Sequence, residues 1–334
     1  ISYTYIPGLA QTPVTSTAPD DASIFNYDPH TAQLTGSQNL QSEHTFEYNF
    51  TGQLITEAWK DHVSGKESAT TFTQTLSGRP LSRIDTNGMT CVYAYDHLAR
   101  IKSVTQGQIL ATFDYDELGQ MNLISVQDES SQQIVETRLT FDDQGRETVR
   151  HISLGGDHPA QTITQSYRDD NRLKNRHLQV GEQTELLETF GYDQHGRMME
   201  YICEGERQPK DRYGNAIHNQ LFTFDALDNI TAVYTTFADG TMDEAVSSFA
   251  QSDPCQLIRI THSHPDYVLE GEIELEYDEN GNLVQDETGQ ILHYDSQSRL
   301  VRVTGTDGQD VSQYRYDAHS SLLGVKHGTE HETL

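Results

Sequence analysis

The feature that most constrains this chain is a short pattern that recurs along it. In Tyr277-Asp278-Glu279-Asn280-Gly281-Asn282-Leu283 an aromatic residue precedes an acid, two variable positions, a glycine, a polar residue and an apolar residue. The same form begins again at Tyr27, Tyr48, Tyr95, Tyr115, Phe141, Tyr167, Tyr192, Phe224, Tyr294 and Tyr316. Such a repeat sets the architecture of the whole chain, so it has to be interpreted before any other feature.

The Asp-x-x-Gly part of the pattern predicts a hairpin turn. Aspartate suits the first position of a type I turn, where its carboxylate can accept backbone N–H groups. Glycine suits the left-handed residue of the bulge that follows a three-residue hairpin loop. Asn171 and Asp228 replace it in two copies, and both residue types tolerate positive φ. Ala99, Ser298 and Ser320 fit this position less well, so we expect those turns to be strained or of another type.

The residues on either side of the turn predict two strands. The aromatic residue ends the incoming strand, and the apolar residue six positions later opens the outgoing one, with Glu147 as the exception. Residues 45–48 and 273–277 alternate apolar and polar side chains, as half-buried strands do. One repeat is therefore one β-hairpin, which needs stacked neighbours to bury its apolar face. The sequence predicts an all-β fold of repeated, stacked hairpins.

The spacing of the copies supports this interpretation and shows where it is interrupted. Successive aromatic residues lie 20 to 26 positions apart from Tyr95 to Tyr192, which accommodates two strands and their turns. A gap of 47 after Tyr48 hides a worn copy at residues 74–81, where Gly78-Arg79 remains.

The domain organisation follows from the same pattern. We expect an irregular lead-in at residues 1–22 and a repeat domain at residues 23–334. Insertions are expected at about residues 203–220 and 237–268. Residues 243–250, within the second insertion, could form one or two helical turns.

Composition excludes several classes of partner. A formal charge of −29 argues against nucleic acid, which needs a basic footprint, and against anionic membrane surfaces. It favours a basic partner or cargo. No apolar run approaches the roughly 20 residues that span a bilayer. Low apolarity with high charge is also typical of disorder, but 17 tyrosines and regular alternation argue against it.

Few residues have the arrangement of a chemical site. His262, His264 and Asp266 could bind one metal ion, although a loop with two exposed histidines is the commoner interpretation. Residues 278–282 faintly resemble a calcium loop, but a hairpin turn explains every copy of the pattern. The three cysteines have no spacing typical of a zinc site or disulfide framework. We therefore expect no catalytic, cofactor-binding or metal-binding residues, and no enzyme.

These motifs resemble the Rhs or YD-repeat family, whose members include bacterial Rhs toxins and the C subunits of Tc toxin complexes. The resemblance covers Tyr27 to Leu322 and is strongest over residues 277–300. The stretch Asp253-Pro254-Cys255-Gln256-Leu257 and the later Asp266-Tyr267 also resemble what precedes that block in the family. The resemblance implies a curved, spiralling β-sheet that is part of a hollow shell.

The resemblance also implies a function. The shell encloses a toxic C-terminal domain until delivery, and the expected partners are that domain and the remaining shell segments or a partner toxin subunit. Secretion is expected, and membrane insertion by this segment is not. The Asp-Pro-x-Gly motif of the family's autoprotease core is not present, so we expect neither autoproteolysis nor toxicity of this chain.

Two other functions stay open at this stage. A cell-surface carbohydrate-binding or adhesin module could use exposed tyrosines beside aspartates to stack on sugars. A hydrolase could act through the second insertion, with His262 and Asp266 as its residues. The shell hypothesis predicts instead that most repeat aromatics are buried between neighbouring hairpins.

Overall fold

The computed structural model describes residues 2–6, 9–17, 21–268, 273–328 and 330–333. The chain forms two compact units. Unit 1 contains residues 1–94 and 275–334, so both ends of the chain contribute to it, and unit 2 contains residues 95–274.

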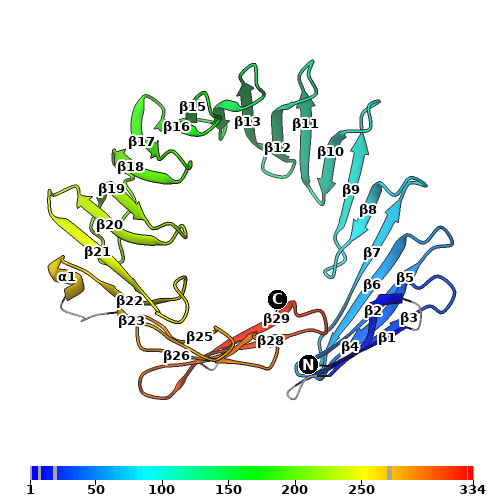
Figure 1. Cartoon of the computed structure of the whole chain (residues 1–334). Helices are drawn as coiled ribbons and strands as arrows, with labels where there is room; N and C mark the ends of the chain where they lie inside the picture. The colour runs from blue at the N-terminus through cyan, green and yellow to red at the C-terminus, as the bar shows by residue number, and fades with distance from the viewer. Residues whose placement is uncertain (1, 7–8, 18–20, 269–272, 329, 334) are drawn as a thin grey trace. The chain divides into compact units, whose positions relative to one another are not determined.

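Unit 1 consists of antiparallel strands that pair in chain order (Figure 1). Its first part is made of β1 (Ser2–Ile6), β2 (Leu9–Thr17), β3 (Ala22–Tyr27), β4 (Leu34–Gln38), β5 (Ser42–Tyr48), β6 (Leu54–Asp61), β7 (Glu67–Gln74), β8 (Pro80–Ile84) and β9 (Thr90–Tyr95). Its second part is a sheet of β24 (Glu276–Tyr277), β25 (Leu283–Gln285), β26 (Ile291–Tyr294), β27 (Leu300–Thr304), β28 (Asp310–Tyr316), β29 (Leu322–His327) and β30 (Glu330–Thr333).

Unit 2 continues the same construction as one antiparallel sheet with a single short helix among its described residues. Its strands are β10 (Ile101–Gln106), β11 (Ile109–Tyr115), β12 (Met121–Asp128), β13 (Gln133–Phe141), β14 (Glu147–Ser153), β15 (Gln161–Tyr167), β16 (Leu173–Val180), β17 (Gln183–Tyr192), β18 (Met198–Glu204), β19 (Ile217–Phe224), β20 (Ile230–Phe237), β21 (Met242–Phe249), β22 (Leu257–Thr261) and β23 (Ile273–Glu274). The helix α1 (Pro265–Val268) lies between β22 and β23.

The register confirms the predicted hairpins. The aromatic residue faces the apolar residue six positions later, as Tyr167 faces Leu173 and Tyr115 faces Met121, whereas Tyr27 faces Leu34, seven positions later. A register shift precedes the aromatic residue in both ladders, which is the predicted bulge. The exceptional Glu147 takes the same place opposite Phe141, so the backbone geometry does not need an apolar residue there.

The structure differs from two expectations. Residues 2–6 and 9–17, expected to be irregular, pair as the hairpin β1–β2, and residues 7–8 and 18–20 lie outside the described residues. Residues 243–250, read as possible helical turns, form most of β21, which pairs with β20 and β22. Pairing with strands on both sides outweighs the weak local preference of this segment.

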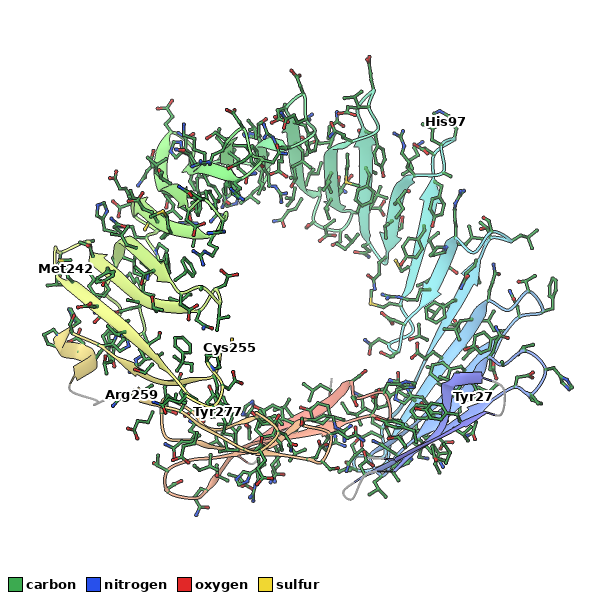
Figure 2. The ribbon with its side chains drawn as sticks, in the orientation of Figure 1. Tyr27, His97, Met242, Cys255, Arg259 and Tyr277 are labelled. Carbon is green, nitrogen blue, oxygen red and sulfur yellow. The ribbon has the colours of Figure 1, made fainter. Side chains whose placement is uncertain are left out.

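Burial is confined to a few places because the hairpins form thin sheets. Strand β7 alternates between exposed and half-buried residues along its whole length. In the described part of unit 2, the fully buried residues fall between Glu188 and His264, where the two insertions lie. In unit 1, buried polar residues such as Ser37 and Asp61 lie near the buried Asp317 and its neighbours. Figure 2 shows side chains projecting from both faces of the ribbon.

Candidate functional site

In most repeats the turn is held by the aspartate that follows the aromatic residue, and Asn49 and Arg168 stand at this position in two copies. In the turn after β13, Oδ1 of Asp142 accepts the backbone N–H groups of Gln144 and Arg146, both at 3.0 Å. Gly145 closes the turn with an N–H bond of 2.9 Å to the Asp142 carbonyl, at φ 78°. The turn is therefore satisfied within five residues, as predicted for the Asp-x-x-Gly pattern.

The residue after the glycine connects one repeat to the next, and we call it the clamp residue. Nε of Arg146 donates to Oδ2 of Asp142 at 2.7 Å, and its Nη1 donates to Oδ1 of Asn171 in the next turn at 2.7 Å. The hydrogen bonds from this guanidinium, and then from the Arg146 amide, hold the pKa of the Asp142 carboxyl below its usual value. The aspartate thus stays charged and the clamp closed at neutral pH.

The same link recurs in both units, with glutamine or asparagine in place of arginine in some turns. It joins the turn after β3 to that after β5, and the turn after β5 to that after β7. It also joins the turns that follow β11, β17 and β24 to the turns that follow β13, β19 and β26, respectively. The donors are Gln33 to Gly52 O, Gln53 to Thr75 O, Gln120 to Gly145 O, Arg197 to Asp225 O and Asn282 to Ser298 Oγ. These clamp residues form runs of turn-to-turn hydrogen bonds, which we call the clamp ladder.

The aromatic residue of the next repeat completes the clamp. The guanidinium of Arg146 lies 4.7 Å from the ring centre of Tyr167, and the Tyr167 hydroxyl donates to the Glu147 carbonyl at 2.7 Å. Arg100 and Tyr115 repeat this arrangement, with a ring distance of 4.1 Å and a bond of 2.8 Å to the Ile101 carbonyl. The cation–π contact holds the face of the ring, and the backbone hydrogen bond holds its hydroxyl group.

The aromatics are therefore engaged, although they are not fully buried as the shell hypothesis predicted. Each repeat aromatic is half-buried. Tyr192 and Tyr316 donate to the carbonyls of Leu173 and Leu300 at 2.9 and 2.7 Å. A ring that carries an arginine on its face and a bonded hydroxyl is not free to stack on a sugar.

The turns with poor candidates for the glycine position keep the common geometry. Ala99, Ser298 and Ser320 have φ of 65°, 59° and 64°, and their N–H groups bond the carbonyl of the turn's aspartate as glycine does. These turns are not of another type. Left-handed conformation without glycine is a strained state that the rest of the clamp maintains.

A second set of contacts joins the two ends of the chain within unit 1, and we call it the terminal seam. Arg315 on β28 donates to both carboxylate oxygens of Asp61, each at 2.8 Å, and the Asp61 side chain is fully buried. Arg299 lies 3.3 Å from Oδ2 of Asp21. Nδ2 of Asn39 donates to the Tyr316 carbonyl at 3.0 Å. These contacts hold the turns of β26–β29 against the first hairpins.

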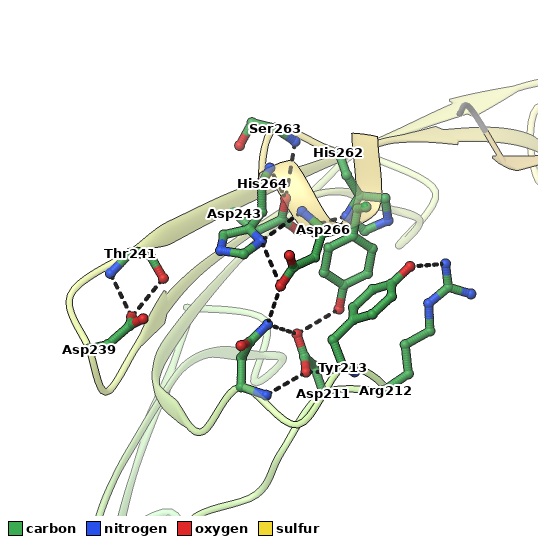
Figure 3. Close-up of polar contacts among 12 residues, drawn as sticks. Asp211, Arg212, Tyr213, Asp239, Thr241, Asp243, His262, Ser263, His264 and Asp266 are labelled. Carbon is green, nitrogen blue, oxygen red and sulfur yellow. Dashed lines mark hydrogen bonds and ion pairs between the residues drawn. The ribbon is translucent and has the colours of Figure 1, made fainter. Parts of the chain in front are cut away.

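The two insertions meet in a polar cluster around a buried aspartate (Figure 3). Oδ2 of Asp243 lies 2.7 Å from Nδ1 of His262, and its Oδ1 accepts the N–H groups of Ser263 and His264 at 3.0 Å each. Tyr267 stacks on the His262 ring at 4.2 Å. One carboxylate thereby fixes the whole turn that leads into α1.

The first insertion reaches this cluster through a further turn. Asp211 accepts the N–H groups of Tyr213 and Asn215 at 2.9 and 2.8 Å, as the repeat turns do. Asn215 also donates to Oδ2 of Asp266 at 3.1 Å, and the Tyr267 hydroxyl donates to Asp211 at 3.2 Å. This turn was missed in the sequence because Lys210 stands where the aromatic belongs, although Asp-x-x-Gly-Asn is present.

The geometry does not support the chemical sites considered from the sequence. His262 pairs with Asp243, whereas Asp266 binds Asn215, so the two proposed hydrolase residues act in separate contacts. Both histidines of the segment have largely buried side chains, so the expectation of two exposed histidines was wrong. Among the described residues there is no group of three or more His, Cys, Asp or Glu side chains placed to hold a metal ion. The acid of residues 278–282 caps its hairpin turn.

Several exposed side chains in the turns belong to none of the clusters described above. Figure 2 labels His97, in the turn after β9, and Cys255, in the turn after β21. Cys255 is an exposed free thiol, while Cys203 is buried and donates to the Ile217 carbonyl at 2.9 Å. Burial raises the pKa of the Cys203 thiol, which keeps it protonated at neutral pH. Among the described residues, no helix has the length and hydropathy to cross a bilayer.

The fold and its clamp ladder define a class of protein, the hairpin-repeat shells built from YD motifs. The family model described as Teneurin YD-shell matches residues 133–333, which is more than half of the chain. The chain belongs to this YD-shell family.

Solved structures share the fold at low sequence identity. The Photorhabdus luminescens Tc holotoxin pore with a mutated TccC3 matches 97% of this chain and 20% of its own, with 14% identity and a TM-score of 0.60. TcdB2–TccC3–Cdc42 matches 94% and 20%, with 14% identity and a TM-score of 0.59. This chain therefore spans about a fifth of the length of those chains. No curated protein matches the sequence.

Proposed function

We propose that this chain is a wall segment of a shell that encloses a toxic domain until delivery. The observation that carries the proposal is the clamp ladder. Arg146 and Arg197 each bind the aspartate of their own turn and the turn of the next hairpin, which adds rigidity to the sheet without a second layer of structure. A thin wall of this kind is suited to enclosing another domain, a function that depends on its shape and requires no catalytic residue.

The partners follow from the same proposal. The TcdB2–TccC3–Cdc42 structure combines TccC3 with TcdB2, which supports assembly of this segment with further shell segments or a second toxin subunit. The formal charge of −29 favours a basic cargo. Action outside the producing cell, and therefore secretion, is part of the proposal.

The test uses the complete protein that the gene encodes. Limited proteolysis should leave any domain outside the repeats resistant as long as the wall is intact. The double substitution Arg146→Ala and Arg197→Ala removes two clamps and should make that domain sensitive. Arg138→Ala is the matched control, because the side chain of Arg138 is 59% exposed and, within the described residues, its ion pair is with Glu136 on its own strand.

Two outcomes would overturn the proposal. A domain that is digested at the same rate with an intact and an unclamped wall is not enclosed by it. A complete protein that yields no resistant fragment beyond the repeats contains no cargo of the proposed kind.

A further inference from the structure

The terminal seam contains a histidine with an unusual environment. The ring of His44 on β5 stacks against Phe46 and meets the ring of His319 edge-on, with centre distances of 6.3 and 6.1 Å. His319 stands on the turn after β28, at the other end of the chain. Its Nε2 lies 2.8 Å from Oγ of the buried Ser37. The two imidazoles therefore meet across the seam.

The surroundings of His44 do not favour a positive charge on its ring. Its side chain is 11% exposed, and within the described residues its Nε2 has no hydrogen-bond partner. Oδ2 of Asp317 lies 3.5 Å from that nitrogen. Oδ1 of Asp317 accepts the N–H groups of His319 and Ser321 at 2.8 Å each, while Oδ2 faces His44 without forming a hydrogen bond to it.

The charged groups around His44 act in opposite directions. Burial lowers the pKa of His44 most strongly, and His319 lowers it further, while Asp317 on the same turn and Glu57 on β6 raise it. The net effect is a pKa below the usual histidine value. A positive charge on His44 would face the edge of a second imidazole, that of His319, across the seam.

We propose that the terminal seam is an acid-sensitive latch, held shut while His44 is neutral and loosened when mild acid protonates it. The sign follows from linkage. The seam-bound form binds a proton less readily than the opened form, so the seam is fully stable above the ordinary histidine pKa of about 6.5. It weakens as the pH falls below that value. The inference concerns the wall alone, so it stands or fails independently of any enclosed cargo.

The neighbouring ion pair between Asp61 and Arg315 does not respond to mild acid, which leaves histidine as the group that responds. Hydrogen bonds from Arg315 hold the pKa of the Asp61 carboxyl far below its usual value, so this pair remains intact in mild acid. Loss of seam contacts between pH 7.5 and 5 therefore has to come from His44 and its surroundings. The latch loosens at one end while the Asp61–Arg315 contact keeps the two parts of unit 1 associated.

The chain carries its own reporter for this event. Trp59 is the single tryptophan and is the cross-strand partner of His44. A charged imidazole beside an indole lowers its emission intensity, whereas opening of the seam admits water and shifts its emission maximum to longer wavelength. The experiment is a fluorescence titration of the whole chain from pH 8 to 5. The expected result is a reversible red shift with a midpoint below 6.5.

Two variants distinguish the latch from general acid sensitivity. His44→Gln, which cannot be charged, should lose the red shift. His30→Gln, at an exposed histidine in the turn after β3, should keep it. No red shift in the wild-type chain, a red shift that survives in His44→Gln, or one that is lost in His30→Gln overturns the proposal.

A second measurement needs no variant. The urea midpoint of the wild-type chain should fall between pH 7 and 5.5. If protonated His44 instead formed a stabilising pair with Asp317, the midpoint would rise over the same range, and the latch would be refuted.

Discussion

The carboxylate of Asp61 receives both terminal nitrogens of Arg315, although the two residues are 254 positions apart. The Asp61 side chain is fully buried, and that of Arg315 is 19% exposed. Two parallel N–H···O bonds give this pair both strength and a defined geometry. It links the first hairpins directly to the last ones in unit 1.

Removing either partner should weaken unit 1 because the other is left without its counter-charge. We expect Asp61→Ala to lower the free energy of unfolding by about 3 kcal/mol. Urea unfolding of the whole chain measures this change. The double variant Asp61→Ala with Arg315→Met should lose less than the sum of the two single variants. Additive losses would contradict a direct coupling between the two side chains.

The same pair makes a prediction in strong acid. The folded-state pKa of Asp61 is lowered, first by Arg315, so its contribution to stability is complete above the ordinary carboxyl value of about 4. As the pH falls below 4 this contribution should be lost. The difference in unfolding free energy between the wild-type chain and Asp61→Asn should therefore narrow from pH 5 to pH 2.5. A constant difference would mean that the carboxylate charge plays no part.

The clamp predicts that arginine is required for its shape as well as its charge. Arg146→Ala should cost about 1 to 2 kcal/mol of unfolding free energy, because the bonds to Asp142 and Asn171 are both lost. Arg146→Lys should recover less than half of this loss, since an ammonium group cannot bind two turns and lie flat on Tyr167.

The control for this experiment lies in the same sheet. Arg138 pairs with Glu136 at 3.0 Å, but its side chain is 59% exposed, so Arg138→Ala should cost less than about 0.5 kcal/mol. Equal losses for Arg138→Ala and Arg146→Ala would show that the clamp is no stronger than an ordinary surface ion pair.

We predict that the hydroxyl of a repeat tyrosine contributes to stability only where it forms a hydrogen bond. Tyr167→Phe removes the bond to the Glu147 carbonyl and should cost about 1 kcal/mol. Tyr48 holds the same place in its repeat, but its hydroxyl has no hydrogen-bond partner in the described residues, so Tyr48→Phe should be close to neutral. Thermal or urea unfolding of both variants compares them directly, and a neutral Tyr167→Phe would refute the proposed role.

The repeats could be predicted from the sequence because their determinants are local. An aspartate, a left-handed residue and a following strand satisfy one turn within five residues, and the pattern repeats often enough to be recognised. The clamp residue could also have been recognised from the sequence, since arginine or an amide recurs after the glycine. Its role was not assigned because its second partner lies in the next repeat, as Asn171 does for Arg146.

The seam and the insertion cluster could not be predicted in the same way. Asp61 and Arg315 are common residue types without any local pattern that relates them. Asp243 likewise gives no sign in the sequence that it will bind His262 and two backbone N–H groups. Residues 243–250 could form one or two helical turns by sequence, and pairing with β20 and β22 decides their conformation.

The first insertion contains a glycine that should tolerate no side chain. Gly205 has φ 125°, and an added Cβ would overlap the backbone carbonyl of Glu185, which cannot move without disturbing β17. Gly205→Ala should therefore cost about 3 kcal/mol or more, with the largest effect on the packing around Cys203. Gly88→Ala is the matched control, because Gly88 has φ 75° but open space around its Cα. It should cost only about 1 kcal/mol, the ordinary penalty for a left-handed alanine. Urea unfolding separates the two, and similar losses would mean that φ alone, and not the contact with Glu185, fixes glycine at this position.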